Sequence, residues 1–336
     1  PLKLNGLMTI GMNQNPQIAD QQTVLCPICS APSHYDFSGR DLMYGLRVRY
    51  DYYQCTACCS VFQVPMPDMT MIASFYPENY MVYDQETRVR KVSAMRQAIL
   101  HRTRGYKHLR PSLPARVFAF LAAPFSGAMT PSWEGGGRML DIGCGNGRFM
   151  TAMRSLGWAV QGVEFSEAGV SAARMSGLDV HHGDLASAAF PDGAFDLVTV
   201  RHVVEHVPDP HGFIAEIARV VRPGGRLVIE TPNSDALGRQ WFGPRWYAND
   251  VPRHLFLFSP KNMELLGAVH GLRVGSVSMD TTPKIFLNSL DYAVGNAGTP
   301  SKRIAWRRFL ARAYVFLARR SGRGDVFQMV FVKPAP

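Results

Sequence analysis

The clearest hydrophobic pattern lies in the middle of the chain, where an apolar run meets glycines at alternate positions. Met139, Leu140 and Ile142 are the apolar part of RMLDIGCGNGR and predict a short buried strand. The following FMTAMRSLG has the periodicity of an amphipathic helix that ends at Gly157. Because glycine lets the backbone turn sharply and lets a ligand approach the main chain, this stretch predicts the opening unit of a nucleotide-binding α/β domain.

Predicted strands and helices then alternate to the end of the chain. A helix capped by Ser166 and ended by Gly177 and another capped by Ser259 lie between strands. The further predicted strands are WAVQGVE, LDVHHGDL, residues 195–200, RLVIETPN, LRVGSVSMD and an antiparallel edge partner, DVFQMVFVK. The pattern predicts an α/β fold with a seven-stranded, doubly wound, Rossmann-like sheet.

Acidic residues mark the ends of the first three predicted strands. Asp141 precedes the glycine turn, Glu164 ends the second strand and Asp184 ends the third. A dinucleotide site has GxGxxG, whereas an acid followed by GxGxG suits a ligand with an ammonium group, and a carboxylate after the second strand accepts hydrogen bonds from ribose. With the PDGAFD and RPGG turns, this pattern resembles the class I S-adenosylmethionine-dependent methyltransferases, whose first motif is DxGxGxG.

The resemblance implies an S-adenosylmethionine-dependent methyltransferase. In that family the glycine turn lies against the amino-acid part of the cofactor, and an acid after the third strand bonds the adenine amino group. Carried onto this sequence, the implied cofactor-binding residues are Asp141, Gly143, Cys144, Gly145, Gly147, Glu164, Phe165, Asp184, Leu185 and Arg201.

Three interpretations compete for RHVVEHVPDP, which follows the fourth predicted strand. A histidine could act as a general base towards the acceptor, or the segment could be a structural turn. In the third, His202, Glu205 and His206 bind a divalent metal, as is thought for the similar E-x-x-E-H of ubiquinone-biosynthesis O-methyltransferases. PRHLFLFSP also resembles a pattern whose histidine points to the active site. The catalytic candidates are therefore His202, His206 and His254.

Four cysteines near the N-terminus have the spacing of a metal site. Two C-x2-C pairs, Cys26 with Cys29 and Cys55 with Cys58, are separated by 25 residues. Four thiolates on two such knuckles favour a structural Zn²⁺ site over redox cysteines. The strand-like RVRYDYYQ between them suits a zinc ribbon, and we expect Cys59 to be a small buried residue.

The sequence divides into a flexible tail (1–20), the zinc ribbon (21–70), a helical linker covering the cofactor (71–134) and the methyltransferase domain (135–336). A ribbon followed by an FYPENY-like segment resembles a bacterial methyltransferase group associated with sugars and natural products. Aromatic residues of FYPENYMVYD line the cofactor cover or belong to the core. An insertion at 234–258 predicts a substrate lid, in which we expect Phe256 and Phe258 to be core. Its predicted substrate-binding residues are Trp241, Trp246, Tyr247 and Arg253.

Charge is unevenly distributed over the 336 residues, whose formal net charge is +10. The segment 88–116 has nine Lys and Arg and 302–323 has eight, with no acid in either, so the remainder is net negative. Such patches suit a membrane surface, an anionic substrate, RNA or plain solvation. In the basic insertion 281–324, the amphipathic part 301–323 could lie on a membrane or pair with a subunit, but we favour packing on the body.

Composition narrows the remaining choices. With 46% apolar residues the chain can form a full core, no run approaches the roughly 20 apolar residues of a membrane span, and the N-terminus lacks a signal-peptide pattern. We expect a cytoplasmic protein, with a peripheral membrane location as an alternative, and no DNA partner.

The predicted function is O-methylation of a small molecule, either a sugar, a glycan precursor or a natural product, with an anionic acceptor among the options. One alternative is an RNA methyltransferase that grips RNA with the ribbon and basic helices, although the NPPF or PPY motif of base-amine methylation is absent after the fourth strand. Another is a catalytically silent cofactor-binding module. The sequence does not set the oligomeric state.

Overall fold

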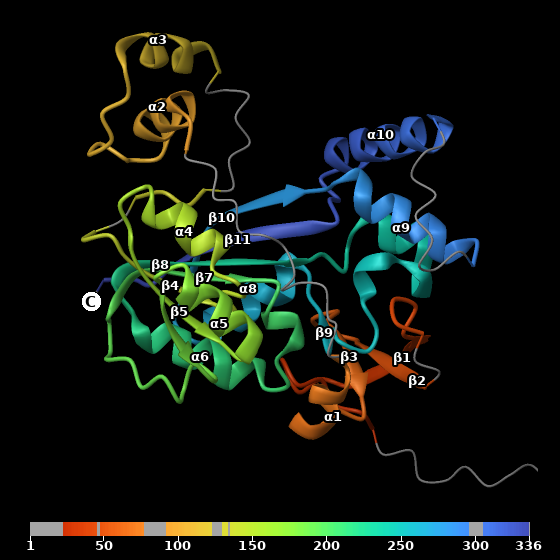
Figure 1. The fold of residues 1–336 in the computed structure, drawn as a ribbon. Coiled ribbons are helices and arrows are strands. Elements are labelled where there is room, and N and C mark those ends of the chain that lie inside the picture. Colours follow the sequence, from red (N-terminus) through yellow and green to blue (C-terminus); the bar gives the residue numbers. More distant parts are fainter. Residues whose placement is uncertain are drawn as a thin grey trace, which may run out of the picture.

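A computed structural model describes residues 23–45, 48–76, 92–122, 130–133, 135–295 and 305–335. A large sheet lies between helices, and a smaller sheet packs beside it (Figure 1). The predicted tail at 1–20 and residues 77–84 of the aromatic segment lie outside the described residues.

The large sheet has seven strands in the order β10-β11-β8-β7-β4-β5-β6. All neighbouring pairs are parallel except those of β11, which runs antiparallel to both β8 and β10. This confirms the predicted doubly wound sheet and its antiparallel partner strand. The strands are β4 (Arg138–Ile142), β5 (Ala159–Glu164), β6 (Asp179–His182), β7 (Phe195–Arg201), β8 (Val221–Pro232), β10 (Arg273–Asp280) and β11 (Val326–Val332).

Helices cover both faces of this sheet because alternate side chains of each central strand point to opposite faces. Leu140 and Val198 pack with α6 (Pro210–Val220) and α8 (Pro260–Val269) on one face. Met139 and Leu197 pack on the other face with α4 (Arg148–Arg154) and α2 (Ala94–Thr103). The side chains of Ser166 and Ser259 cap α5 (Glu167–Met175) and α8, as the sequence predicts. A further helix, α3 (Leu113–Ala122), contacts α2.

The small sheet joins the cysteine-rich segment to the catalytic domain. Its order is β1 (Ser33–Arg40), β2 (Arg49–Cys55), β3 (Val61–Val64) and β9 (Phe256–Leu257), and the last strand comes from the predicted lid. Phe62 of β3 pairs with Phe256 of β9, and both are buried in the main core with Phe258. The core expectation for Phe256 and Phe258 is therefore correct. Helix α1 (Met69–Ser74), capped by Asp68, follows the ribbon.

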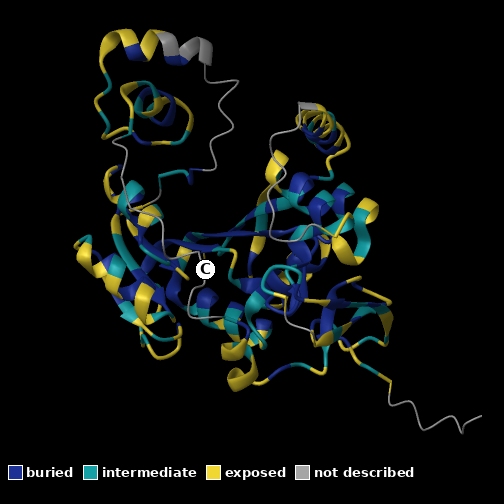
Figure 2. Cartoon of the chain, turned by 45° about the vertical axis from the view of Figure 1, so that its right-hand side comes forward, coloured by how far each residue is buried: buried dark blue, intermediate teal, exposed yellow. Residues whose placement is uncertain are grey.

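The two insertions of the catalytic domain pack against each other. The lid contains α7 (Leu237–Phe242) and the short 3-10 helices η3 (Gly243–Arg245) and η4 (Tyr247–Asn249), all of which contact α9 (Pro283–Ala293). Phe286 of α9 stacks on Tyr314 of α10 (Ala305–Arg320) with ring centroids 4.8 Å apart. The lid therefore packs against the basic insertion. Figure 2 shows that the residues between these two segments are buried. Among the described residues, no helix combines the length and apolarity needed to cross a bilayer.

Candidate functional site

The glycine turn between β4 and α4 combines two packing glycines with one that borders open space. All three glycines have positive φ: 69° at Gly143, 54° at Gly145 and 73° at Gly147. A Cβ at Gly143 would lie 2.2 Å from Val203 Cγ2, and one at Gly147 would lie 2.2 Å from Leu178 Cδ1. A Cβ at Gly145 would meet no atom within 4 Å, so this glycine leaves its backbone open to a ligand.

Glu164 ends β5 directly beside this turn because β4 and β5 pair in parallel register. Its Oε2 accepts a hydrogen bond from the Gly145 N–H at 2.7 Å, and its Oε1 accepts one from the Ser166 N–H at 2.8 Å. The carboxylate is buried and fixed, yet each oxygen keeps acceptor capacity. The adjacent Phe165 is 65% exposed, so its ring can stack on a base. A fixed acceptor beside an open backbone fits the ribose and amino-acid parts of S-adenosylmethionine.

Asp141 is buried at the end of β4 and accepts a hydrogen bond from Thr199 Oγ1 at 2.6 Å. Burial raises the pKa of Asp141 to about 6, although the bond from Thr199 acts in the opposite direction. An ammonium group beside this carboxylate would favour its ionised form. The site therefore has an anionic group that a cationic ligand can stabilise.

The other predicted cofactor residues surround the same edge of the sheet. Leu185 and the Cys144 thiol are buried, and burial raises the pKa of Cys144. Asp184 accepts a hydrogen bond from the Ser187 N–H at 2.7 Å, which lowers its pKa. Arg201 lies over the Phe149 ring and pairs with Glu230 at 3.6 Å. Their contacts with the cofactor remain predictions.

His202 lies between two carboxylates and has a positive φ of 54°. Its Nδ1 is 3.4 Å from Glu205 Oε1, and its Nε2 is 3.4 Å from Glu230 Oε1. Burial alone would lower the pKa of His202, but the two carboxylates raise it to about 9. The imidazole is therefore protonated near neutral pH, which disfavours the predicted role of His202 as a general base.

His206 and His254 form a second pair, with ring centroids 4.7 Å apart. His206 Nδ1 lies 2.8 Å from the Arg253 carbonyl, and His254 Nδ1 lies 3.0 Å from the Ala248 carbonyl. Because a carbonyl oxygen only accepts, each Nδ1 carries a hydrogen, and in the neutral form of each ring the lone pair is on Nε2. Burial lowers the pKa of His254 to about 4, so this ring is neutral.

Glu205 completes the cluster. It is 1% exposed, and its Oε2 accepts a hydrogen bond from Thr231 Oγ1 at 2.9 Å. Its Oε1 has no well-aligned hydrogen bond, but it pairs with His202 Nδ1 at 3.4 Å and lies 3.9 Å from His254 Nε2. Ligand atoms of Glu205, His206 and His254 all lie within 4.8 Å of one another. A buried carboxylate oxygen facing imidazole nitrogens fits a divalent cation.

This geometry corrects the predicted ligand set of His202, Glu205 and His206. Both ring nitrogens of His202 lie 3.4 Å from a carboxylate, of Glu205 and of Glu230, and the ligand atoms that converge within 4.8 Å belong to Glu205, His206 and His254. His254, which is distant in sequence, takes its place because the Leu255 N–H donates to the Glu205 carbonyl at 2.8 Å.

The four N-terminal cysteines converge as the spacing predicts. The Sγ atoms of Cys26 and Cys58 are 3.6 Å apart, those of Cys29 and Cys55 are 3.4 Å apart, and all four lie within 4.8 Å. Sulfurs at about 2.3 Å from a tetrahedral zinc are separated by roughly 3.8 Å, so the set fits Zn²⁺. Cys59 is a correction, since its positive φ of 60° turns the side chain into solvent rather than into the core.

Arg253 has a structural contact where the sequence predicts a substrate contact. Its side chain is fully buried, with Nη1 2.8 Å from Asp41 Oδ2 and Nη2 2.6 Å from Asp250 Oδ1. Asp41 belongs to the ribbon and Asp250 to the lid, so the guanidinium ties the two together. Both aspartates compete with an anionic substrate for this guanidinium, but Arg253 also lines the pocket between the ribbon and the lid, so its substrate role stays a prediction.

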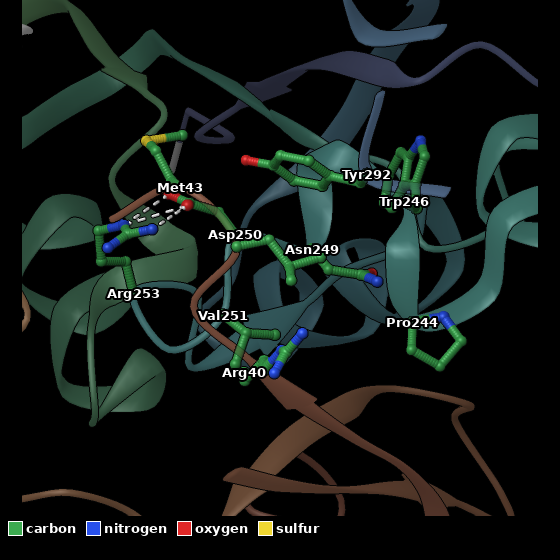
Figure 3. A pocket seen from close by; sticks show the side chains of 10 residues that line it. Arg40, Met43, Pro244, Trp246, Asn249, Asp250, Val251, Arg253 and Tyr292 are labelled. Carbon is green, nitrogen blue, oxygen red and sulfur yellow. Dashed lines mark hydrogen bonds and ion pairs between the residues drawn. The ribbon is translucent and has the colours of Figure 1, made fainter. Parts of the chain in front are cut away.

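A pocket opens between the ribbon and the lid, next to this ion cluster (Figure 3). Arg40 and Met43 line it from the ribbon, and Trp246, Asn249 and Asp250 line it from the lid. Asp250 Oδ2 also lies 3.9 Å from His254 Nε2, which connects the pocket to the histidine pair.

The predicted lid aromatics have different surroundings. Trp246 lines the pocket but is buried, and its Nε1 donates to Asp325 at 3.1 Å. Tyr247 is half-buried, with its ring 5.6 Å from that of Tyr292, which lines the pocket. Trp241 packs on Tyr314 instead and is 52% exposed. The substrate roles of Trp246 and Tyr247 remain predictions, whereas Trp241 belongs to the contact with α10.

Sequence reasoning missed several residues that support the site. Thr199 and Glu230 interrupt apolar strands, and a polar residue in a buried run is a signal that could have found them. Asp250 lies three residues before Arg253, and this local spacing is a signal that could have found it. Tyr52 carries no such signal, because His254 comes close to it only after β9 joins the ribbon.

The strand order, the glycine turn and the acid after β5 define a class I S-adenosylmethionine-dependent methyltransferase. A family described as a methyltransferase domain matches residues 106–277, which is half of the chain. The chain belongs to this methyltransferase domain family.

Curated relatives agree with the family. The chain is 42% identical over 105 residues to a ubiquinone biosynthesis O-methyltransferase of Aromatoleum aromaticum, covering 29% of this chain and 45% of the relative. It is 34% identical over 164 residues to the protein of the same name from Maricaulis maris, covering 46% and 63%. The chain thus spans about half the length of the curated relatives it matches.

Solved structures are more remote. A methyltransferase from Archaeoglobus fulgidus is 21% identical with a TM-score of 0.43, covering 65% of this chain and 92% of that one. One from Mesorhizobium loti is 18% identical with a TM-score of 0.43, covering 63% and 97%. The fold assignment therefore depends on the strand order and on the family match.

Proposed function

We propose that the protein transfers the methyl group of S-adenosylmethionine to an oxygen of a small-molecule acceptor, either a sugar, a glycan precursor or a natural product. The family match and the names of the curated O-methyltransferases support methyl transfer to oxygen. The cofactor supplies an electrophilic methyl group. Asp141, Glu164 and the turn around Gly145 hold it by its charged and ribose groups.

The observation that carries the proposal is the free Nε2 of His254. Its Nδ1–H is fixed by the Ala248 carbonyl, so the ring presents a lone pair beside Asp250 and Glu205. This nitrogen takes the hydroxyl proton from the acceptor as the methyl group is transferred. The protein otherwise orients the two reactants and keeps water out.

The region between the ribbon and the lid is the proposed acceptor side of the molecule. The pocket there is small, with a volume of about 10 Å³, and Asp250, which lines it, has its Oδ2 3.9 Å from His254 Nε2, so an acceptor that takes the place of Asp250 beside this ring would place its hydroxyl against the proposed base. Arg253 is neutralised by its two aspartates, which leaves the exposed Arg40 as the cation for an anionic acceptor.

A divalent cation on Glu205, His206 and His254 would compete for the same Nε2 lone pair. Such a cation would supply Lewis-acid polarisation of the acceptor oxygen. The two uses exclude each other because one lone pair cannot bind both a metal and a proton.

The experiment is a turnover assay for S-adenosylhomocysteine with a panel of phenolic, sugar and nucleotide-sugar acceptors and with RNA. We expect small-molecule turnover, and we expect His254→Asn to lower kcat by about 10²–10⁴-fold while cofactor affinity stays within about twofold. A chelator is then added at a concentration that leaves the ribbon zinc bound. Full activity under these conditions supports His254 as a general base. Loss of activity that only added Mg²⁺ or Mn²⁺ restores supports a catalytic cation instead. Transfer to RNA alone would overturn the acceptor class, and cofactor binding with no turnover would indicate a silent module.

A further inference from the structure

Helix α10 is anchored to the body by one face only. Ala311, Tyr314 and Ala318 of that face are buried against α9 and the lid. Arg307, one turn earlier, is buried and pairs with Asp291 of α9 at 2.6 Å. This confirms the favoured expectation that the helix packs on the body, but it accounts for only one side of the helix.

The outer side of α10 carries large apolar side chains in a continuous stripe. Residues spaced by three and four positions share one face of a helix, and these fall at relative positions 0, 3, 4, 10 and 11. They are Trp306 (56% exposed), Phe309 (71%), Leu310 (40%), Phe316 (68%) and Leu317 (45%). The helix lies at the periphery of the molecule (Figures 1 and 2), so this stripe faces outwards.

Arginines run alongside the apolar stripe. Arg308, Arg312 and Arg319 lie on the flank between the stripe and the buried face, and all are exposed. Within the part of the chain that the structure describes, Arg308 and Arg312 have no ion pair, and Arg319 has only an exposed one with Asp280 at 3.4 Å. The segment 302–323 contains no acid. The helix is therefore packed, apolar and cationic on three successive faces.

We propose that the outer face of α10 docks on an anionic lipid bilayer, with the helix lying in the plane of the interface. A tryptophan, phenylalanines and leucines on one face and arginines beside them are the composition of an interfacial helix. The apolar rings and chains enter the boundary of the acyl region, while the arginine stems extend along it and place their guanidinium groups at lipid phosphates.

Two other occupants fit the same residues less well. RNA binds through cations and stacking rings, which leaves Leu310 and Leu317 exposed to water without a role. A second copy of the chain, related by a two-fold axis through the stripe, would bring the acid-free arginine flanks of two helices together. An anionic lipid surface with an apolar interior provides partners for the apolar stripe and for the arginines beside it.

The test is co-sedimentation of the full chain with vesicles of pure phosphatidylcholine and with vesicles containing 30% phosphatidylglycerol (about this fraction gives an anionic surface). We expect binding to the anionic vesicles that weakens as salt increases. Arg308→Gln/Arg312→Gln should weaken binding about 25-fold, since each arginine near such a surface contributes about fivefold. Adding Phe309→Ser and Phe316→Ser to this variant should weaken vesicle binding by at least another factor of about ten.

Matched controls are Met175→Ser, an exposed apolar residue on α5, and Arg273→Gln at the far end of β10. Both should bind vesicles like the original chain, and cofactor affinity should be equal in all variants, which shows that each is folded. Equal sedimentation with both kinds of vesicle, or loss of binding in the controls, would overturn the proposal. The proposal would also be overturned if the chain does not bind vesicles but forms an RNA complex or a dimer in sedimentation velocity, and if the same α10 variants abolish that complex or dimer.

Discussion

Tyr52 of the cysteine-rich ribbon donates a hydrogen bond from its hydroxyl to the main-chain carbonyl of His254, at 2.8 Å. Tyr52 is fully buried and lies three residues before Cys55, one of the four thiols of the proposed zinc site. The ribbon therefore holds the backbone of the proposed base in place. The proposed zinc site and the proposed base are thus connected through β2.

Loss of zinc should consequently reduce turnover without removing the cofactor. Cys55→Ser is expected to abolish zinc binding, lower Tm and reduce kcat, because β2 and β3 no longer position β9 and His254. Affinity for S-adenosylmethionine should change less than about threefold, since the glycine turn and Glu164 belong to the large sheet and not to the ribbon sheet.

Metal analysis, calorimetry and turnover on the same preparation check these three effects. Cys59→Ser is the matched control, because Cys59 is exposed and outside the thiol cluster, and it should keep zinc, Tm and activity. Turnover at the original rate in a zinc-free Cys55→Ser protein would show that the ribbon does not position His254.

Breaking the buried ion cluster should be strongly destabilising. Arg253→Met leaves the carboxylates of Asp41 and Asp250 without their guanidinium, and removing one partner of a buried pair costs about 3–5 kcal/mol. Arg138→Gln removes an exposed partner of Asp196, so we expect a loss below about 1 kcal/mol. Urea unfolding of both variants measures the difference, and equal losses would contradict the structural role of Arg253.

Cofactor affinity should depend on the ionisation of Asp141. Burial raises its pKa to about 6 in the folded chain, above the ordinary value of 3.8. The folded state therefore prefers the protonated carboxyl, and this preference is lost as pH rises through about 6. A bound ammonium needs the ionised form, so affinity should fall about tenfold per pH unit below pH 6.

Thr199→Val offers a sharper version of this pH test. It removes the hydroxyl that stabilises the Asp141 carboxylate at 2.6 Å but keeps the side-chain shape. The midpoint of the affinity profile should therefore shift to higher pH. Calorimetric titrations of the cofactor from pH 5 to pH 8 measure this midpoint. Affinity that does not change with pH in either protein would show that Asp141 does not bind the cofactor.

The sequence predicts those features that depend on local spacing. The glycine turn, the acid at Glu164 and the paired cysteines are set by neighbours in the chain, and the seven-stranded sheet follows from strand and helix alternation. The ion cluster of Arg253 could not be predicted because its partner Asp41 lies more than 200 residues away. The exchange of His202 for His254 in the candidate metal set has the same origin, since the bond from the Leu255 N–H to the Glu205 carbonyl and the pairing of β3 with β9 bring His254 to Glu205.

Residue spacing in the sequence also did not predict which side chains are exposed to solvent. Cys59 looks like its buried neighbours in sequence, but its left-handed backbone turns it outwards. The amphipathic pattern of α10 predicts a buried face correctly, but it does not predict that a second apolar face stays exposed. Periodicity identifies which residues share a face and does not identify what covers that face.

The central claim is that Glu164 and the glycine turn hold S-adenosylmethionine. The most direct measurement is calorimetric titration of the cofactor into the original chain, Glu164→Ala and the control Glu167→Ala, whose exposed carboxylate lies on α5 outside the turn. We predict one cofactor per chain, no detectable binding to Glu164→Ala despite an unchanged circular dichroism spectrum, and unchanged affinity in Glu167→Ala. Equal affinity in all three proteins, or no heat with the original chain, would contradict the account.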